Sequence, residues 1–212
     1  MKYRPGIRFT RVQKTASSSL RQLIWGLKNP RIHVFEHGYV YNPWESKEQE
    51  NRYHNTEWEG FREPVDISKY YNPLDTIISI IRNPFDIFVS YYLHSHKDGW
   101  GMVNKLHNIN SFDAFVDYYL DPSKEWHLPP MKKSMFSFLY DQNDKLITDV
   151  YYKLEEIEKI NNLLNALGMP NLKHTNKTLL KTKDFRNYYK PAQVEALSKV
   201  WKRDLDYFNY NF

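Results

Sequence analysis

Cysteine is absent from this chain of 212 residues. Its absence excludes disulfide bonds, thiol chemistry and cysteine-based metal sites. Long apolar runs are absent as well, because no stretch approaches the roughly 18 to 20 apolar residues of a membrane span and no signal-peptide-like region follows Met1. We therefore expect a soluble, cytoplasmic protein.

Blocks of basic residues are also missing, although the formal net charge is +5. Such a modest excess fits an anionic ligand, but without a basic block or a recognised nucleic-acid-binding module a nucleic-acid partner is not expected. The hydrophobic content of 41% over 212 residues suffices for one substantial core. The sequence therefore predicts a single domain over residues 1–212.

A polar loop joins a strand predicted over about residues 6–12 to a helix predicted over about 17–28, whose apolar residues have the 3-4-3 spacing of a helix face. Such a loop presents backbone N–H groups at the positive end of the helix dipole, so a phosphate or sulfate group fits it. The candidate anion-binding residues combine a cation, hydroxyls and backbone groups: Lys14, Thr15, Ala16, Ser17, Ser18 and Ser19.

Two other interpretations of this loop stay open at this point. Thr15 or a neighbouring serine is of the type that simply caps a helix. A nucleotide-triphosphate loop of the Walker A kind is disfavoured, because it needs glycines at the positions that Arg8 and Gln13 occupy.

A second anion site is predicted beyond the strand expected over about residues 75–81. Its near-continuous β-branched run is typical of an interior strand in a parallel sheet. Asn83 and Pro84 suit the start of a helix, which places Arg82 at the carboxyl end of the strand and Ser90 two turns along the helix. Open α/β sheets bind ligands at that edge, where a guanidinium can bind a second phosphate.

These two segments together resemble the phosphate-binding motifs of sulfotransferases. Lys14 to Ser19 is similar to the 5′-phosphosulfate loop, and Arg82 to Ser90 is similar to the 3′-phosphate motif. The similarity is closest to the carbohydrate branch, including heparan sulfate 2-O-sulfotransferase-like enzymes, where the loop often reads Lys-Thr-Ala-Ser. The chain departs from the pattern at Gln13 and at Ser18, where proline and threonine are usual, but neither change removes an anion-binding group.

The resemblance implies an α/β fold, with a single P-loop-like domain in which helices flank a central parallel β-sheet on both faces. It implies transfer of a sulfuryl group from 3′-phosphoadenosine 5′-phosphosulfate (PAPS), without a metal, to a hydroxyl or amine, expected on a carbohydrate. Lys14 would stabilise the oxygen between sulfur and the 5′-phosphate, and Arg82 with Ser90 would bind the 3′-phosphate. A basic loop carrying Lys177 and Lys181 would close over the nucleotide, although a solvated basic turn is equally compatible with its composition.

A second strand is predicted over residues 31–36. His37 is the candidate general base, because it follows this strand at the same sheet edge and histidine titrates near neutrality. The segment from His37 resembles a His-Gly-His-Val element of 2-O-sulfotransferases, with Tyr39 in place of the second histidine. Glu36 and His54 are the alternatives. The aromatic-rich stretch at about 40–71 is expected to cover the acceptor, although a surface flap packed on the sheet is equally compatible with its composition.

Two rival functions remain at the level of the sequence. One is a P-loop-like kinase with Glu155 or Asp86 as metal ligand, and the other is a catalytically silent nucleotide-fold module that binds a glycan or a protein. The remaining predicted elements are a strand at about 149–154 and helices at about 84–97, 111–120, 130–139, 155–167 and from Pro191 past Trp201.

Overall fold

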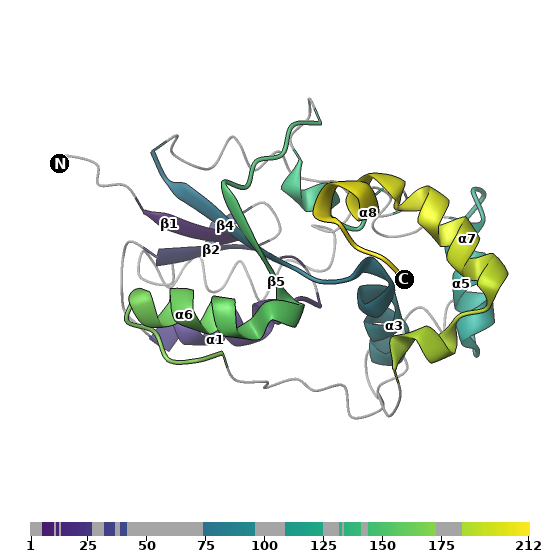
Figure 1. Cartoon of the computed structure of the whole chain (residues 1–212), viewed down its shortest axis with the longest axis horizontal. Coiled ribbons are helices and arrows are strands. Elements are labelled where there is room, and N and C mark those ends of the chain that lie inside the picture. The colour runs from purple at the N-terminus through teal and green to yellow at the C-terminus, as the bar shows by residue number, and fades with distance from the viewer. Residues whose placement is uncertain are drawn as a thin grey trace. The chain divides into compact units, whose positions relative to one another are not determined.

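The computed structural model places two compact units, residues Met1–Ile81 with Phe136–Asn176 and residues Arg82–Met135 with Lys177–Phe212 (Figure 1). The first unit holds the β-sheet and the second is helical. Within them the structure describes residues 6–10, 12, 14–26, 32–36, 39–41, 74–95, 109–124, 132, 134–140, 144–172 and 184–212.

A five-stranded sheet in the order β3-β2-β1-β4-β5 forms the centre of the first unit. Its strands are β1 (Ile7–Thr10), β2 (Ile32–Glu36), β3 (Tyr39–Tyr41), β4 (Thr76–Ile81) and β5 (Val150–Lys153). Strand β1 pairs in parallel with β2 and β4, and β4 with β5, whereas β3 runs antiparallel to β2. The carboxyl ends of the four parallel strands therefore share one edge, and the predicted α/β class with a parallel sheet is confirmed.

Strand β4 is buried on both of its faces. Ile78 and Ile80 contribute to an apolar cluster on one face, while Ile77 and Ile81, which alternate with them, are also buried. A strand with no solvent-facing side reads as a continuous apolar run, which is the pattern that predicted it.

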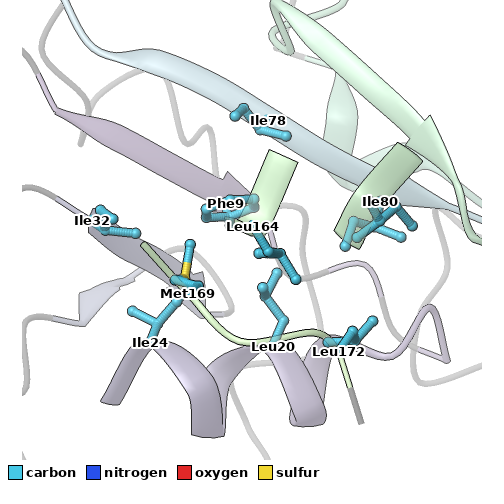
Figure 2. Close-up of a cluster of buried hydrophobic side chains, with 10 residues drawn as sticks. Phe9, Leu20, Ile24, Ile32, Ile78, Ile80, Leu164, Met169 and Leu172 are labelled. Carbon is cyan, nitrogen blue, oxygen red and sulfur yellow. The ribbon is translucent and has the colours of Figure 1, made fainter. Parts of the chain in front are cut away.

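Helices α1 (Ser17–Gly26) and α6 (Ile157–Ala166) cover the same face of the sheet (Figure 1). Figure 2 shows how their side chains meet those of the strands in one apolar cluster. Its buried members are Phe9, Leu20, Ile24, Ile32, Ile78, Ile80, Ile160, Leu164, Met169 and Leu172. Because α1 begins where the loop after β1 ends, this cluster fixes both flanks of that loop.

Helix α6 ends two residues before a glycine in the left-handed conformation. Gly168 has a φ of 74°, and the N–H groups of Gly168 and Met169 donate to the carbonyls of Asn165 and Leu164 at 2.9 and 2.8 Å. This is the Schellman arrangement, in which the left-handed residue favours glycine. Leu164 and Met169 also pack in the apolar cluster, so the helix end is held on the sheet.

The amino ends of β1 and β4 are joined by a buried carboxylate. Asp75 accepts the Gly6 N–H at 2.7 Å through Oδ1 and the Arg8 Nε–H at 2.7 Å through Oδ2, and its side chain has no exposed surface. The Thr76 N–H donates to the Gly6 carbonyl at 2.9 Å. Asp75 therefore fixes the register in which Ile7 lies opposite Thr76.

Three buried hydroxyls also connect the parallel strands. The Thr10 hydroxyl donates to Ser79 Oγ at 2.8 Å, and the Ser79 hydroxyl donates to Thr148 Oγ1 at 2.8 Å. Thr10 and Ser79 alternate with members of the apolar cluster, so they lie on the opposite face of the sheet. Because Thr10 is the last residue of β1, this chain of hydrogen bonds holds the strand where the polar loop begins.

The second unit is formed mainly by helices. They are α3 (Pro84–Ser95), α5 (Phe112–Leu120), the 3₁₀ helix η6 (Phe185–Tyr188), α7 (Pro191–Val200) and α8 (Lys202–Phe208). Their core is aromatic: the ring of Phe88 lies 4.8 Å from those of Phe115 and Tyr119, centroid to centroid. The fully buried Trp201 donates its indole N–H to the Tyr119 hydroxyl at 2.7 Å, so its polar atom is satisfied inside the core.

The predicted helix at 130–139 is wrong. Among the described residues of that segment, 134–136 do not form a regular helix, and Ser137–Leu139 forms the short 3₁₀ helix η4. The reason is a tertiary contact: buried Asp204 accepts the Ser134 hydroxyl at 2.7 Å and the Met135 N–H at 2.6 Å. These bonds to a distant carboxylate replace the local bonds of a helix.

Two smaller differences concern the remaining elements. The three-residue strand β3 was not predicted, and it pairs with β2 so that Glu36 lies opposite Tyr39. The last predicted helix is divided at Trp201 into α7 and α8. The described helices include none that is long and apolar enough to cross a membrane.

Candidate functional site

The loop between β1 and α1 contains two residues in the left-handed conformation. Lys14 and Ala16 both have a φ of 62°, whereas Thr15 between them is not in this region. The conformation costs a residue with a side chain about 1–2 kcal/mol, so it persists only where the surroundings enforce it. Successive N–H groups in turns that include left-handed residues can converge into an anion-binding concavity. The sequence predicted the loop, but its lack of glycine gave no sign of this backbone.

Thr15 is held at the base of the loop. It is 1% exposed, and its hydroxyl donates to the Val12 carbonyl at 2.8 Å. The helix begins immediately afterwards, with the Leu20 N–H donating to the Ala16 carbonyl at 3.0 Å. The Thr15 hydroxyl thus donates its proton within the loop, and Lys14 beside it is partly buried.

Ser17, Ser18 and Ser19 form the first turn of α1, where N–H groups lack carbonyl partners within the helix. Ser19 is buried at 5% exposure. The strand, the loop and the helix start therefore occur where the sequence predicts them. The structure brings Lys14 to Ser19 together at the positive end of α1.

Arg82 follows β4 directly and is paired with a carboxylate in the first turn of α3. Its Nε–H donates to Asp86 Oδ2 at 2.7 Å, and Nη2 approaches the same oxygen. The two side chains are 18% and 13% exposed. Asp86 therefore fixes the direction of the guanidinium while leaving it within reach of solvent.

The start of α3 is held by hydrogen bonds on both sides. Asn83 Oδ1 accepts the Phe85 N–H at 3.0 Å, which confirms Asn83 as the cap, and its Nδ2 donates to the Asn211 carbonyl at 2.7 Å. The Tyr189 hydroxyl donates to the Phe85 carbonyl at 2.7 Å, and burial raises the pKa of this phenol, so it remains a donor. Ser90 lies further along this anchored helix at 6% exposure.

Sequence reasoning missed three features of these motifs. The left-handed residues lack the usual glycine signal, and the hydroxyl chain from Thr10 depends on strand pairing. The pairing of Arg82 with Asp86 could have been predicted from the sequence, because oppositely charged residues four positions apart at the start of a helix lie close together.

Several predicted site residues lie outside the described residues. They are His37, His54, Lys177, Lys181 and most of the expected flap at 40–71. Glu36 is the last residue of β2, and of the flap only Val40 and Tyr41, in β3, are described. The assignments of the general base and of the nucleotide-covering loop therefore stay predictions.

The model of the sulfotransferase family matches residues 1–211 of the chain. The chain belongs to the sulfotransferase family. This confirms the predicted family and the predicted class of enzyme, while the carbohydrate branch stays a prediction. No curated protein matches the chain.

Three solved structures are similar to this member of the sulfotransferase family. A sulfotransferase from Alicyclobacillus acidocaldarius is 13% identical with a TM-score of 0.48, covering 100% of this chain and 98% of that one. A mouse sulfotransferase complexed with PAP is 16% identical with a TM-score of 0.49, covering 95% and 85%. A retinol dehydratase in complex with androsterone and inactive cofactor PAP is 14% identical with a TM-score of 0.34, covering 100% and 84%.

The structure also bears on the kinase alternative for this sulfotransferase-family chain. Asp86, one of the two metal ligands considered, is engaged by Arg82, and Glu155 is exposed in the 3₁₀ helix η5 (Leu154–Glu156). Within the described part of the chain, His, Asp and Glu residues form no group of three or more that could hold a metal ion. The expectation of a metal-free reaction stays a prediction.

Proposed function

We propose that the chain transfers a sulfuryl group from PAPS to a hydroxyl or amine of a carbohydrate acceptor. The observation that carries this proposal is the backbone of the β1–α1 loop, with Lys14 and Ala16 left-handed at the positive end of α1, in a chain of the sulfotransferase family. Such a loop suits the 5′-phosphate of the donor, because N–H groups and a lysine converge on one anion.

Lys14 has the catalytic role in this proposal. When the acceptor oxygen bonds to sulfur, the bond from sulfur to the 5′-phosphate oxygen breaks, and that oxygen gains negative charge. A lysine ammonium beside it stabilises this charge more in the transition state than in the bound donor. The acceptor proton passes to a base, for which His37 is proposed, with Glu36 and His54 as alternatives.

Arg82 and Ser90 would bind the 3′-phosphate and so orient the nucleotide. Support comes from the position of Arg82 immediately after β4, since β4 is the parallel neighbour of β1 and their carboxyl ends share one edge of the sheet. The pairing with Asp86 aligns the guanidinium for bidentate binding. Lys177 and Lys181 are proposed to close over the nucleotide from the basic loop that carries them.

A carbohydrate is the proposed acceptor because the Lys-Thr-Ala-Ser letters and the segment from His37 resemble the carbohydrate branch. The aromatic-rich stretch at about 40–71 would cover the acceptor, since aromatic rings with interspersed charges suit polyhydroxylated molecules.

We also propose that residues 1–212 act as one domain in the cytoplasm.

The first test is whether the desulfonated donor 3′-phosphoadenosine 5′-phosphate (PAP) binds. At about 100 times its Kd, PAP should raise the melting temperature by roughly 5–10 °C. ATP with Mg²⁺ at the same concentration is the control and should have a smaller effect. A shift with ATP and Mg²⁺ alone contradicts the proposal.

The second arm of this test is transfer of radiolabelled sulfate from PAPS to a panel of glycans, phenols, lipids and peptides. Incorporation into a glycan supports both the activity and the acceptor class. Incorporation only into another class corrects the acceptor. PAP binding without incorporation into any acceptor would instead favour the catalytically silent module.

A further inference from the structure

The Thr15 side chain is placed to support the loop from beneath. It is 1% exposed, so a nucleotide outside the loop does not reach its hydroxyl, and the hydroxyl proton is used in the 2.8 Å bond to the Val12 carbonyl. Hydroxyl residues in such loops are expected to donate to phosphate, but the Thr15 hydroxyl donates instead to the Val12 carbonyl of its own loop.

The residues on either side of Thr15 are the two left-handed ones. Lys14 and Ala16 each have a φ of 62°, although neither is glycine. The conformational cost of two such residues exceeds what one neutral hydrogen bond contributes, so further contacts must help to hold the loop. Val12 is 2% exposed and Ala16 packs against the apolar cluster, so both ends of the segment are anchored.

We propose that Thr15 is a positioning residue that holds Lys14 and Ala16 in their left-handed conformation and so preorganises the N–H groups of the loop for phosphate. The inference rests on the proposed function, because it names how the 5′-phosphate site is formed. Thr15 acts through its neighbours: its own N–H belongs to the loop, but its hydroxyl does not touch the nucleotide. Without the Thr15–Val12 bond the loop also adopts conformations that do not bind phosphate. The apparent affinity for PAP then falls in proportion to the fraction of molecules whose loop is in the binding conformation.

Three variants test this role. Thr15→Val keeps the shape of the side chain but removes the hydroxyl, Thr15→Ser keeps the hydroxyl, and Ala16→Gly relieves the left-handed strain. The Kd of PAP measured by calorimetry should rise about tenfold in Thr15→Val and stay within about twofold in Thr15→Ser. Adding Ala16→Gly to Thr15→Val should recover about half of the loss on a logarithmic scale.

A readout without nucleotide separates this role from the proposed function. Ala16→Gly should raise the urea midpoint of unfolding more in the Thr15→Val protein than in the wild type. In Thr15→Val the Thr15–Val12 hydrogen bond no longer offsets the backbone strain, so relieving that strain has a larger effect. If this coupling is observed but the wild type does not bind PAP, the two proposals separate. The coupling supports the role of Thr15 in the loop, and the absence of PAP binding contradicts the proposed function. PAP binding that is unaffected by Thr15→Val, equal losses in Thr15→Val and Thr15→Ser, or no coupling with Ala16→Gly would overturn the inference.

Discussion

Replacing Lys14 with alanine is expected to lower kcat for sulfate transfer about 100- to 1,000-fold. The ammonium group interacts most strongly with the charge that develops on the oxygen released from sulfur. In the bound donor PAPS that charge has not yet developed, so the Kd of PAPS, measured without an acceptor, should change at most about fivefold. Alanine retains a Cβ, and thus the backbone strain at φ 62° is the same in both proteins.

Single-turnover sulfate transfer together with calorimetric binding of PAPS in the absence of an acceptor measures the two effects separately. Lys199→Ala is the matched control, since Lys199 pairs with Glu195 on the exposed surface of α7 and its side chain is 74% exposed. A Lys14→Ala protein that loses PAPS affinity as strongly as it loses turnover would show that Lys14 is a binding residue only. In that case transition-state stabilisation would have to come from another group.

Replacing Asp75 with alanine is expected to lower the free energy of unfolding by about 3–5 kcal/mol. The substitution leaves the Arg8 guanidinium, with a side chain only 12% exposed, without the carboxylate that accepts its Nε–H. It also removes the acceptor of the Gly6 N–H. Most of this loss comes from leaving the Arg8 guanidinium and the Gly6 N–H without their acceptor, and less of it from the attraction within the ion pair itself.

Urea unfolding followed by circular dichroism tests this expectation. Asp206→Ala is the control: Asp206 pairs with Lys202 four residues away on α8, where the side chains are 64% and 74% exposed, and its loss should cost less than about 0.5 kcal/mol. Similar costs for the two substitutions would mean that Asp75 does not hold the β1–β4 register.

The elements that flank both candidate phosphate-binding segments could be predicted because local patterns determine them. The β-branched run of β4, the Asn83-Pro84 cap and the apolar face of α1 each combine a propensity with a burial pattern. Parallel pairing then places the ends of β1 and β4 at one edge, which is a general property of such sheets. The anion-binding interpretation of both loops followed from these local signals.

The features that could not be predicted depend on a tertiary contact, on strand pairing and on backbone conformations that the local sequence pattern does not signal. Asp204 redirects the hydrogen bonds of Ser134 and Met135, so a segment with helical periodicity forms a turn. The contact proposed to hold Lys14 and Ala16 is local, but the loop has no glycine to signal their left-handed conformation. The short strand β3 exists through its pairing with β2, and a three-residue strand has too few positions to show alternation.

In the proposed site, one nucleotide is bound at its 5′-phosphate by the Lys14 loop and at its 3′-phosphate by Arg82, and the proposed function depends on this two-point binding. Calorimetry with PAP and with adenosine 5′-monophosphate, which lacks the 3′-phosphate, tests it most directly in the wild type and in Arg82→Ala. Arg186→Ala is the control, because Arg186 is exposed and pairs weakly with Asp184 at 3.4 Å. Melting temperatures verify that each variant is folded.

We predict that Arg82→Ala weakens PAP binding about 10- to 100-fold, since hydrogen bonds to a charged group are lost, and leaves binding of the monophosphate within about twofold. Equal losses for the two nucleotides, or no loss for either, would contradict the claim that Arg82 binds the 3′-phosphate.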